Sequence, residues 1–585
     1  MRSPSSRLAA VVLLACFCVL GAPARRKPAA SSKRAASARK RIAAMTLAEK
    51  VAQLVIVPFY GEAPNSRSRE YTRFVRLVRD TGVGGMVLLN RVPKGVVRRA
   101  EPYALAAFTN RMQKLAKIPL IVAGDFERGP SMRVDGATPF PHAMAFGATG
   151  DTSASRYMGE VSAREARALG IHWLLVPVAD VNNNPDNPVI NIRSFGEDPV
   201  GVSAHVKAFL EGANGSAKWP VLTTVKHFPG HGDTAVDTHV SLASAGGDRA
   251  RLNSVELAPF KVAIASGVDA VMTAHIAVPA LDAPDVPATL SAAILTTLLR
   301  GELGFKGLVV TDALEMGGIA GGFKSGEAAV RAIEAGADIL LMPPDPLAAI
   351  NAVVAAAGQG RITRARIEQS LEKILAAKEK LGLNRQRLVD VEAVGDALGD
   401  PEALDRAQAI SDLSVTLVRN EDNMLPLPSD GVCFAVLQEN ARSPLGLTVL
   451  DELRKRVPQA MTVTVGADTA VDVSEAAGRF AGCARVVVFS FSTSGALSDP
   501  LQRFVAALAD AKPVILASIG SPYLLRVFPG VKAYLTTCSN VQPAEISAIR
   551  ALYGEIDIGG RLPVTIPGYA GYGAGIRLPA TRPVP

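Results

Sequence analysis

The sequence predicts an α/β protein in which an N-terminal (β/α)8 TIM-like barrel is followed by a smaller C-terminal α/β sandwich domain. With 585 residues, the chain is too long for one ordinary hydrophobic core. Its composition, 48% hydrophobic and 20% charged, is typical of a globular protein. From about residue 50, short apolar runs alternate with longer segments of helical periodicity, which is the pattern of a parallel sheet covered by helices.

The barrel prediction depends on the number of these apolar runs. They span residues 51–59, 82–89, 118–125, 172–180, 219–227, 268–276, 307–313 and 337–344. Eight strand–helix units fit a closed barrel, and a helical segment ending near residue 385 completes the predicted barrel domain, 45–385. A doubly wound open sheet is the alternative, because a strand count made from sequence can err by one or two.

A second α/β domain is predicted after a linker over residues 386–409. Its strand-like runs are GVCFAVL, MTVTVG, ARVVVFSF, KPVILASIG and KAYLTT. They alternate with helix-like segments and predict a sandwich over residues 410–568, followed by a loop-like tail over 569–585. This region has no histidine and no glycine-rich phosphate loop, so we expect it to be structural or to provide a weak partner surface.

The amino terminus predicts export to the periplasm or the extracellular space. Arg2 and Arg7 precede an apolar run too short for a typical membrane span, and small residues follow it, so residues 1–24 are predicted to be a signal peptide. Lipoprotein anchoring through Cys16 is the second choice, because apolar residues continue after this cysteine. Residues 25–44 are predicted to form a disordered basic tether that contacts anionic envelope polymers or lipid.

The net charge of +9 arises from this amino-terminal part of the chain. Residues 1–41 contain ten Lys or Arg and no acidic residue, which leaves 53 basic and 54 acidic residues, or a net charge of −1. A balanced charge argues against binding to nucleic acid. Beyond the signal peptide only Cys433, Cys483 and Cys538 remain, and this sparse, odd set predicts neither a disulfide framework nor a metal site.

The positions of the histidines indicate that the predicted catalytic site lies in the barrel domain. All seven lie between residues 142 and 275, and three of them occur in KHFPGHGDTAVDTH, residues 226–239. His227 and His231 have the spacing of zinc ligands on a helix, but Pro229 and Gly230 between them break any helix. A metal site is therefore the weaker hypothesis, and no metal or other cofactor is predicted. The simpler expectation for His231 and the residues after it is a hydrogen-bonded tight loop.

Asp237 and His239 predict an acid–base pair. Residues two apart in an extended segment point the same way, so the carboxylate can contact the imidazole and favour its charged form, a proton donor near neutral pH. Asp312, at the end of the seventh apolar run, is the best-placed opposing carboxylate, because catalytic groups of such barrels lie at the carboxyl ends of the strands. Asp312 followed by Glu315 also fits a helix N-cap, and this segment alone favours the cap.

Four ordered segments resemble the β-N-acetylglucosaminidase branch of family 3 glycoside hydrolases. They are MTLAEKVAQL (45–54), ADVNNNPDNPVINIRSFGEDP (179–199), KHFPGHGDTAVDTH (226–239) and GFKGLVVTDALEM (304–316). VTLVRN and GRLPVTIPG extend the resemblance to the second domain of that family. The resemblance implies a retaining enzyme that hydrolyses terminal β-linked N-acetylglucosamine from peptidoglycan fragments or chitin-like oligosaccharides through a covalent glycosyl-aspartate intermediate.

The same resemblance implies a role for seven residues. Asp312 matches the nucleophile, His239 the acid/base and Asp237 its orienting partner, whereas Asp125, Arg193, Lys226 and His227 match residues that bind the hydroxyls of the terminal N-acetylglucosamine. One segment departs from the family pattern. After Asp125 the chain reads FERGPSMRV where many relatives have a pattern like Asp-x-Glu-Gly-Gly-Arg-Val, so the glycine pair is broken and the sequence leaves open whether Arg133 replaces the family arginine.

Two other functions remain open. A neutral histidine base does not repel an incoming phosphate, so the same residues would also suit a β-N-acetylglucosaminide phosphorylase that releases sugar 1-phosphate. A non-catalytic cell-wall-binding protein with a decayed barrel is the third hypothesis, and the intact set of Asp237, His239 and Asp312 argues against it.

Overall fold

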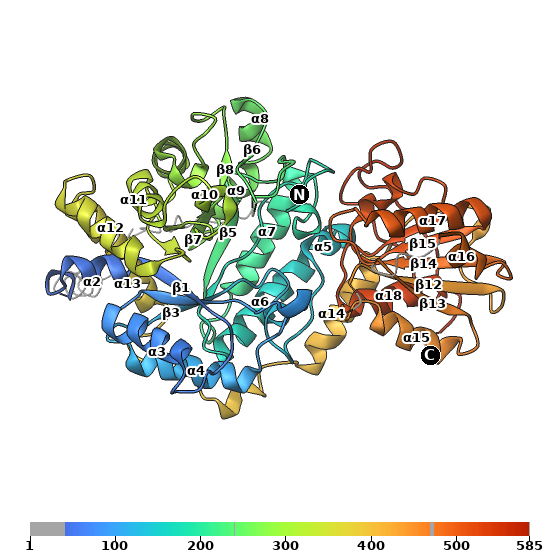
Figure 1. The fold of residues 1–585 in the computed structure, drawn as a ribbon, viewed down its shortest axis with the longest axis horizontal. Helices are drawn as coiled ribbons and strands as arrows, with labels where there is room; N and C mark the ends of the chain where they lie inside the picture. The colour runs from blue at the N-terminus through green and yellow to red at the C-terminus, as the bar shows by residue number, and fades with distance from the viewer. Residues whose placement is uncertain (1–40, 239, 441, 468–472, 584–585) are drawn as a thin grey trace, which may run out of the picture. The chain divides into compact units, whose positions relative to one another are not determined.

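The computed structural model describes residues 41–583 except 239, 441 and 468–472 (Figure 1). The predicted signal peptide and the tether up to residue 40 therefore lie outside the described residues, and residues 41–43 are helical. Residues 45–585 form one compact unit, and it contains both sheets. No helix in the described part of the chain has the length and apolar character that crossing a membrane requires.

Eight parallel strands form the first sheet, in the order β10-β1-β2-β3-β4-β5-β7-β9. They are β1 (Val55–Phe59), β2 (Gly85–Leu88), β3 (Ile121–Gly124), β4 (Trp173–Leu174), β5 (Leu222–Phe228), β7 (Ala270–Thr273), β9 (Leu308–Val310) and β10 (Leu340–Leu341). A parallel bridge between Val310 and Ile339 brings the two ends of the sheet together. Each predicted apolar run contains one of these strands or, for β5, all but its last residue, so the barrel is confirmed and the open sheet is wrong.

Helices surround the barrel strands (Figure 1). They are α2 (Leu47–Ala52), α3 (Arg69–Val75), α4 (Pro102–Leu115), α5 (Ala143–Thr149), α6 (Thr152–Ala168), α7 (Pro199–Ala213), α8 (Arg249–Ser254), α9 (Ala258–Ala265), α10 (Gly317–Ala320), α11 (Ser325–Ala335), α12 (Pro346–Gly358) and α13 (Arg364–Lys380). Two of them begin at an Asp–Pro pair: Asp198 caps α7 and Asp345 caps α12. The carboxylate accepts the free N–H groups of the first turn, and proline needs no partner there.

The strands are apolar because both faces of the barrel wall are covered. Every residue of β2, β3, β5 and β7 is buried. This burial includes Lys226 and His227, which lie near the carboxyl end of β5. Charged groups at such a position need partners, because an uncompensated charge is costly away from water. The ends of the strands are therefore the place where the polar chemistry of the barrel must lie.

The second sheet has six strands in the order β11-β16-β15-β14-β12-β13. The strands are β11 (Thr416–Asn420), β12 (Val432–Gln438), β13 (Thr462–Gly466), β14 (Arg485–Ser490), β15 (Val514–Ser518) and β16 (Ala533–Thr536). The five predicted runs correspond to β12 to β16, whereas β11 was not among the predicted strands. β11 is the only antiparallel member among the described strands of this sheet, and it pairs with β16 at one edge.

Helices pack on both faces of this sheet, which confirms the α/β sandwich. They are α14 (Pro401–Ser414), α15 (Leu447–Arg456), α16 (Val473–Gly478), α17 (Asp499–Ala511) and α18 (Gln542–Leu552). One hydrophobic cluster joins Phe504 and Leu508 of α17 to alternate residues of the central strands. The other cluster joins Leu453 of α15 and Ile549 of α18 to the residues between them, which point to the opposite face.

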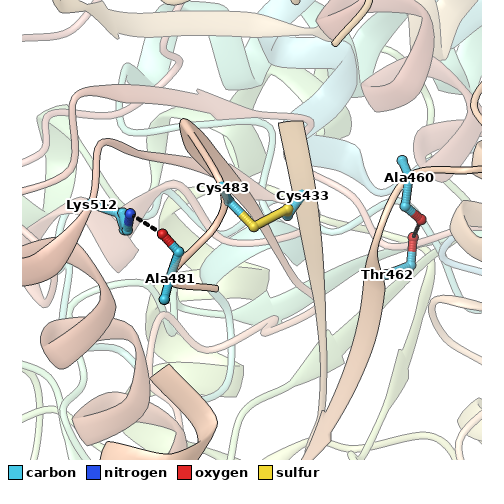
Figure 2. Close-up of a disulfide and its surroundings, with 6 residues drawn as sticks. All are labelled: Cys433, Ala460, Thr462, Ala481, Cys483 and Lys512. Atoms are coloured by element: carbon cyan, nitrogen blue, oxygen red, sulfur yellow. Dashed lines mark hydrogen bonds between the residues drawn. A yellow bond between two sulfur atoms is a disulfide. The ribbon is translucent and has the colours of Figure 1, made fainter. Parts of the chain in front are cut away.

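A disulfide between Cys433 and Cys483 corrects the prediction drawn from the cysteine count. Cys433 lies on β12 and Cys483 just before the neighbouring strand β14, with 5.9 Å between their Cα atoms (Figure 2). The two cysteines are 50 residues apart in the chain. The prediction failed because only the order of the strands brings them together. Cys538 is free and buried.

Candidate active site

A cavity of about 270 Å³ opens among the carboxyl ends of the barrel strands. Five of the seven predicted site residues line it: Asp125, Arg193, Lys226, His227 and Asp312. Small-molecule sites usually occupy about 300–1,000 Å³, so this cavity is suited to one small ring and not to an extended chain. Much of the remaining wall is apolar, and it includes Val87, Leu175, Met272 and Leu341.

Lys226 is the centre of a charged network on one wall. Its Nζ lies 2.6 Å from Oδ1 of Asp125, which follows β3, and 2.8 Å from Oε1 of Glu127. The other oxygen of Asp125 accepts a hydrogen bond from Arg133 at 3.1 Å. Burial opposes the charge of Lys226, but the two carboxylates outweigh it and raise the pKa of this ammonium group. Arg133 therefore does reach the site, which the sequence had left open.

Arg193 forms the second part of this network. It lies in a short 3-10 helix, Asn191–Arg193, and donates two hydrogen bonds to the carboxylate of Glu127, at 2.8 and 2.7 Å. Burial alone would raise the pKa of Glu127, but Arg193 and Lys226 hold it well below its usual range. Glu127 was not predicted as a site residue, although it stands where the family pattern has its glutamate. A bidentate pair fixes the guanidinium plane, so Arg193 presents its remaining donors in a set direction.

His227 is oriented by Asp180, which was not predicted as a site residue. Nδ1 of the ring lies 2.7 Å from Oδ2 of Asp180, and the backbone N–H of His227 donates to Oδ1 at 3.1 Å. The carboxylate accepts the Nδ1 proton and so turns Nε2 toward Arg193, 3.4 Å away, at the cavity. Burial opposes the charge of Asp180, yet the pKa of this carboxyl is lowered by His227 and His231.

Asp312 follows β9 and contributes a carboxylate to the same cavity. Its Oδ1 accepts the N–H of Ala313 at 2.8 Å. Burial opposes the charge, but His227 and His275 outweigh it and lower the pKa of Asp312. The alternative N-cap interpretation is wrong, because the nearest helix, α10, begins at Gly317. His275 supports the turn, since its Nε2 lies 2.9 Å from the carbonyl oxygen of Ala313.

The loop after β5 is held by the predicted hydrogen bonds. Nδ1 of His231 lies 2.8 Å from Oγ1 of Thr234, and Nε2 lies 3.0 Å from Oγ1 of Thr238. Burial lowers the pKa of His231 to about 4, so the ring is neutral at neutral pH. Gly232 is required for close packing, because a Cβ there would lie 1.7 Å from the carbonyl oxygen of Val181.

The predicted pair of Asp237 and His239 is only partly described. His239 lies outside the described residues, so its contact with Asp237 stays a prediction. Asp237 is partly exposed and is not part of the cavity wall, whereas the adjacent Thr238 is. The backbone carbonyl of Thr238 accepts the N–H of Gly318 at 3.0 Å, which ties this segment to the start of α10. The segment that carries the predicted acid/base therefore passes beside the cavity.

The described side chains do not fit a metal ion. Among residues 41–583 without the gaps, no group of three or more His, Cys, Asp or Glu could hold one. Both ring nitrogens of His231 already face threonine hydroxyls, and Nδ1 of His227 faces Asp180. Glu315 is an acidic residue on the cavity wall that was not predicted as a site residue. Burial raises the pKa of its carboxyl group.

Comparisons with known proteins show the family to which both domains belong. The glycosyl hydrolase family 3 N terminal domain matches residues 46–377, and the glycosyl hydrolase family 3 C-terminal domain matches residues 415–579. A β-N-acetylglucosaminidase/β-glucosidase of Cellulomonas fimi is 30% identical over 562 residues, which cover 90% of this chain and 95% of that protein. Beta-hexosaminidase A of Pseudoalteromonas piscicida is 36% identical over 389 residues, covering 57% of this chain and 62% of that protein.

A solved structure extends the similarity to the whole fold. The family 3 β-N-acetylglucosaminidase of Paenibacillus sp. str. FPU-7 has a TM-score of 0.80 and 34% sequence identity, covering 89% of this chain and 99% of that one. Both predicted domains are thus matched, and the predicted resemblance is confirmed. The chain therefore belongs to glycosyl hydrolase family 3 and is a glycoside hydrolase built from that family's two domains.

Proposed function

We propose that this protein is an exported, retaining β-N-acetylglucosaminidase that releases terminal β-linked N-acetylglucosamine from peptidoglycan fragments or chitin-like oligosaccharides. The observation that carries the proposal is the presence of Asp312 in one small cavity with the charged network around Lys226. The names of the similar proteins from Cellulomonas fimi and Paenibacillus include β-N-acetylglucosaminidase, which supports the coarser part of the proposal. A cavity of about 270 Å³ suits one terminal sugar of the substrate.

The charged network is proposed to bind the sugar hydroxyls. Asp125 is engaged by Lys226 and Arg133, and each of its oxygens keeps a lone pair for a hydroxyl donor. Arg193 and Nε2 of His227 supply further polar contacts from the neighbouring wall. Hydrogen bonds to charged groups are stronger than neutral ones, and the mutual pairing of these groups keeps them in place before the sugar arrives.

In the first chemical step, a carboxylate oxygen of Asp312 attacks the anomeric carbon. The bond between that carbon and the leaving oxygen breaks, and the leaving oxygen takes a proton from His239, whose charged form Asp237 favours. The low pKa of Asp312 keeps the nucleophile anionic at neutral pH, and an anion below the ring stabilises the positive charge of the oxocarbenium-like transition state.

In the second step, water attacks the anomeric carbon of the glycosyl-aspartate. Neutral His239 takes the proton of that water, the bond to Asp312 breaks, and the free sugar leaves with the β configuration retained. Phosphate attacking in place of water would instead produce a sugar 1-phosphate. The product formed in phosphate buffer therefore distinguishes the two activities.

Trapping of the intermediate tests the proposal directly. A fluorinated N-acetylglucosamine analogue with a good leaving group should add one sugar to the enzyme, and peptide mapping by mass spectrometry should place that sugar on Asp312. A chromogenic β-N-acetylglucosaminide should release the β anomer first, as seen by NMR. Labelling of another residue would remove Asp312 as the nucleophile, and sugar 1-phosphate as the main product would reclassify the enzyme as a phosphorylase.

Export is proposed from the amino-terminal sequence, and the Cys433–Cys483 disulfide supports it, because disulfides persist mainly in oxidising compartments. Amino-terminal sequencing of the mature protein provides the test. A start near residue 25 is expected. A mature chain that begins at a lipid-modified Cys16 would instead identify a lipoprotein, and an uncleaved chain in the cytoplasm would contradict export.

A further inference from the structure

We propose that Arg128 makes this enzyme selective for β-N-acetylglucosaminides whose leaving group carries a carboxylate. This inference rests on the proposed function and specifies its substrate class. It concerns the segment that departs from the family pattern, where Arg128 stands in place of the first glycine of the pair. The chain thus has a long cationic side chain where that pattern has none.

Arg128 lies beside the place proposed for the terminal sugar. It belongs to the segment after β3, residues 125–134, which contributes Asp125 and Arg133 to the cavity wall. The residue before it, Glu127, pairs with Lys226. Arg128 itself does not line the cavity for the single ring. A group attached to that ring has to extend beyond this cavity, and the inference places it along the segment that carries Arg128.

The two other arginines near Arg128 are each paired with a carboxylate, whereas Arg128 is not paired with any among the described residues. Arg133 bonds to Asp125, and Arg99 lies 3.8 Å from Asp135. These two arginines are close in space, because a parallel bridge joins Ala100 to Val134. Over the described part of the chain, the partly buried side chain of Arg128 makes no hydrogen bond and no ion pair, and its nitrogen atoms are not completely enclosed. A ligand can therefore reach them.

The electrostatic surroundings favour an anion at this position. Burial lowers the pKa of Arg128 to about 10, and Arg99 and Arg133 add to this effect by repulsion. The side chain still carries its charge at neutral pH. The acid that acts on it, Glu127, is already shared between Arg193 and Lys226. A partly desolvated cation without a counterion raises the free energy of the free enzyme. An anionic substrate group that pairs with Arg128 removes this penalty in the complex.

A carboxylate is the anion that best fits both the residue and the proposed substrates. The planar guanidinium group of arginine binds a carboxylate through two parallel hydrogen bonds. In peptidoglycan fragments the sugar that follows N-acetylglucosamine carries a lactyl carboxylate, whereas in chitin-like oligosaccharides it is neutral. The geometry at Arg128 thus separates two substrates that the cavity for the terminal sugar treats alike.

A matched pair of disaccharides tests the inference. N-acetylglucosaminyl-β-1,4-N-acetylmuramic acid and its methyl ester differ in the charge of the lactyl group and otherwise by one methyl group. The wild-type kcat/KM for the acid should exceed that for the ester by about ten- to a hundredfold, the effect of one hydrogen bond between charged groups. The ratio should shrink as salt is added, because salt screens a partly exposed pair.

Substitutions at position 128 and a matched control locate the effect. Arg128→Ala, and Arg128→Gln which keeps most of the side-chain volume, should bring the ratio close to one, and Arg128→Lys should restore part of it. Arg91→Ala is the control: this arginine follows β2 on the same side of the barrel, but Glu62 and Glu70 neutralise it. The control should keep the wild-type ratio.

The outcomes separate this inference from the function on which it rests. Equal wild-type rates on acid and ester, or an unchanged preference in both Arg128→Ala and Arg128→Gln, would overturn the inference while hydrolysis of either disaccharide upholds the proposed function. A wild-type enzyme that cleaves neither disaccharide nor a chromogenic β-N-acetylglucosaminide would overturn the proposed function, and the inference with it.

Discussion

The carboxylate of Asp180 accepts hydrogen bonds from three N–H groups, and one of these donors is Nδ1 of His227, at 2.7 Å. One oxygen accepts the backbone N–H groups of His227 and His231, and the other accepts the ring proton. Asp180 is fully buried and follows β4, whereas His227 lies on the neighbouring strand β5. This contact fixes both the backbone and the ring of a residue in the cavity wall.

Asp180→Asn should therefore impair activity more than stability. The amide retains an oxygen for the two backbone donors, but its NH2 group cannot accept the ring proton, so the imidazole changes tautomer or turns. We expect kcat/KM on a chromogenic β-N-acetylglucosaminide to fall by about ten- to a hundredfold, the size of a small misplacement of a binding group. Asp186→Asn, at an exposed aspartate that pairs with Arg526, is the matched control. Unchanged kcat/KM in Asp180→Asn would show that the pair is not needed.

Asp312→Ala tests the proposed nucleophile by chemical rescue. Removal of a nucleophile commonly costs at least about 10⁴-fold in kcat, and a similar loss is expected here. Azide, a small anion, should enter the space left by the carboxylate, restore turnover and yield the α-glycosyl azide. Glu315→Gln removes another carboxyl from the same cavity wall and is expected to cost far less. Absence of rescue together with near-normal activity of Asp312→Ala would exclude the assignment.

Buried neutral histidines should make the protein less stable in acid. The ring of His205 is buried, lies 2.8 Å from Oγ of Ser155 and stacks on Phe195. Burial lowers its pKa to about 4. An unfolded histidine, with a pKa of about 6.5, binds its proton earlier as the pH falls, so the unfolded state takes up more protons between pH 6.5 and 4. The contribution of the neutral His205 ring to the free energy of unfolding is complete above pH 6.5, and it is lost as the pH falls from 6.5 to 4.

The His205→Gln variant measures that contribution. The loss in the free energy of unfolding from pH 7 to pH 5 should be smaller in the variant than in the wild type by about 2 kcal/mol. Denaturant unfolding at both pH values checks this difference, even if the variant is less stable at pH 7. An identical loss in both proteins would mean that His205 is protonated alike in the folded and unfolded chain.

The disulfide should stabilise the C-terminal domain. It closes a loop of 50 residues between Cys433 and Cys483, for which the loss of unfolded-chain entropy predicts about 4 kcal/mol. Replacement of both cysteines by serine should lower the Tm of this domain, and reductant should lower the Tm of the wild type but not that of the double variant. Peptide mapping of the unreduced, unfolded protein should find a free thiol on Cys538 alone among these three cysteines. Free thiols on Cys433 and Cys483 would contradict the pairing.

Elements with a strong local signal were predictable from the sequence. Buried parallel strands require continuous apolar runs, and the runs around β1 to β10 of the barrel therefore coincide with its eight strands. The edge strand β11 was not predicted from its short run, because it ends in the polar residues Arg419 and Asn420 and lies at the edge of the sheet. Polar residues that end an apolar run, such as Asp125 and Asp312, were recognisable because the end of a barrel strand is where such residues meet.

Contacts between distant segments were not predictable from composition or spacing. Nothing local in the sequence showed that Glu127 would bind Arg193 or that Asp180 would bind His227. The N-cap interpretation of Asp312 failed for the same reason. The local pattern fits a helix start, yet the chain continues as a turn that His275 supports from another strand.

The sequence by itself determined where the barrel strands lie and which family the chain resembles, because these depend on periodicity and on the order of short motifs. Only the tertiary structure decided which charges neutralise one another, that Cys433 and Cys483 are joined, and that Arg128 has no counterion among the described residues. The physical reason is that an ion pair or a disulfide depends on distances of a few ångströms between atoms that strand order, and not chain separation, brings together.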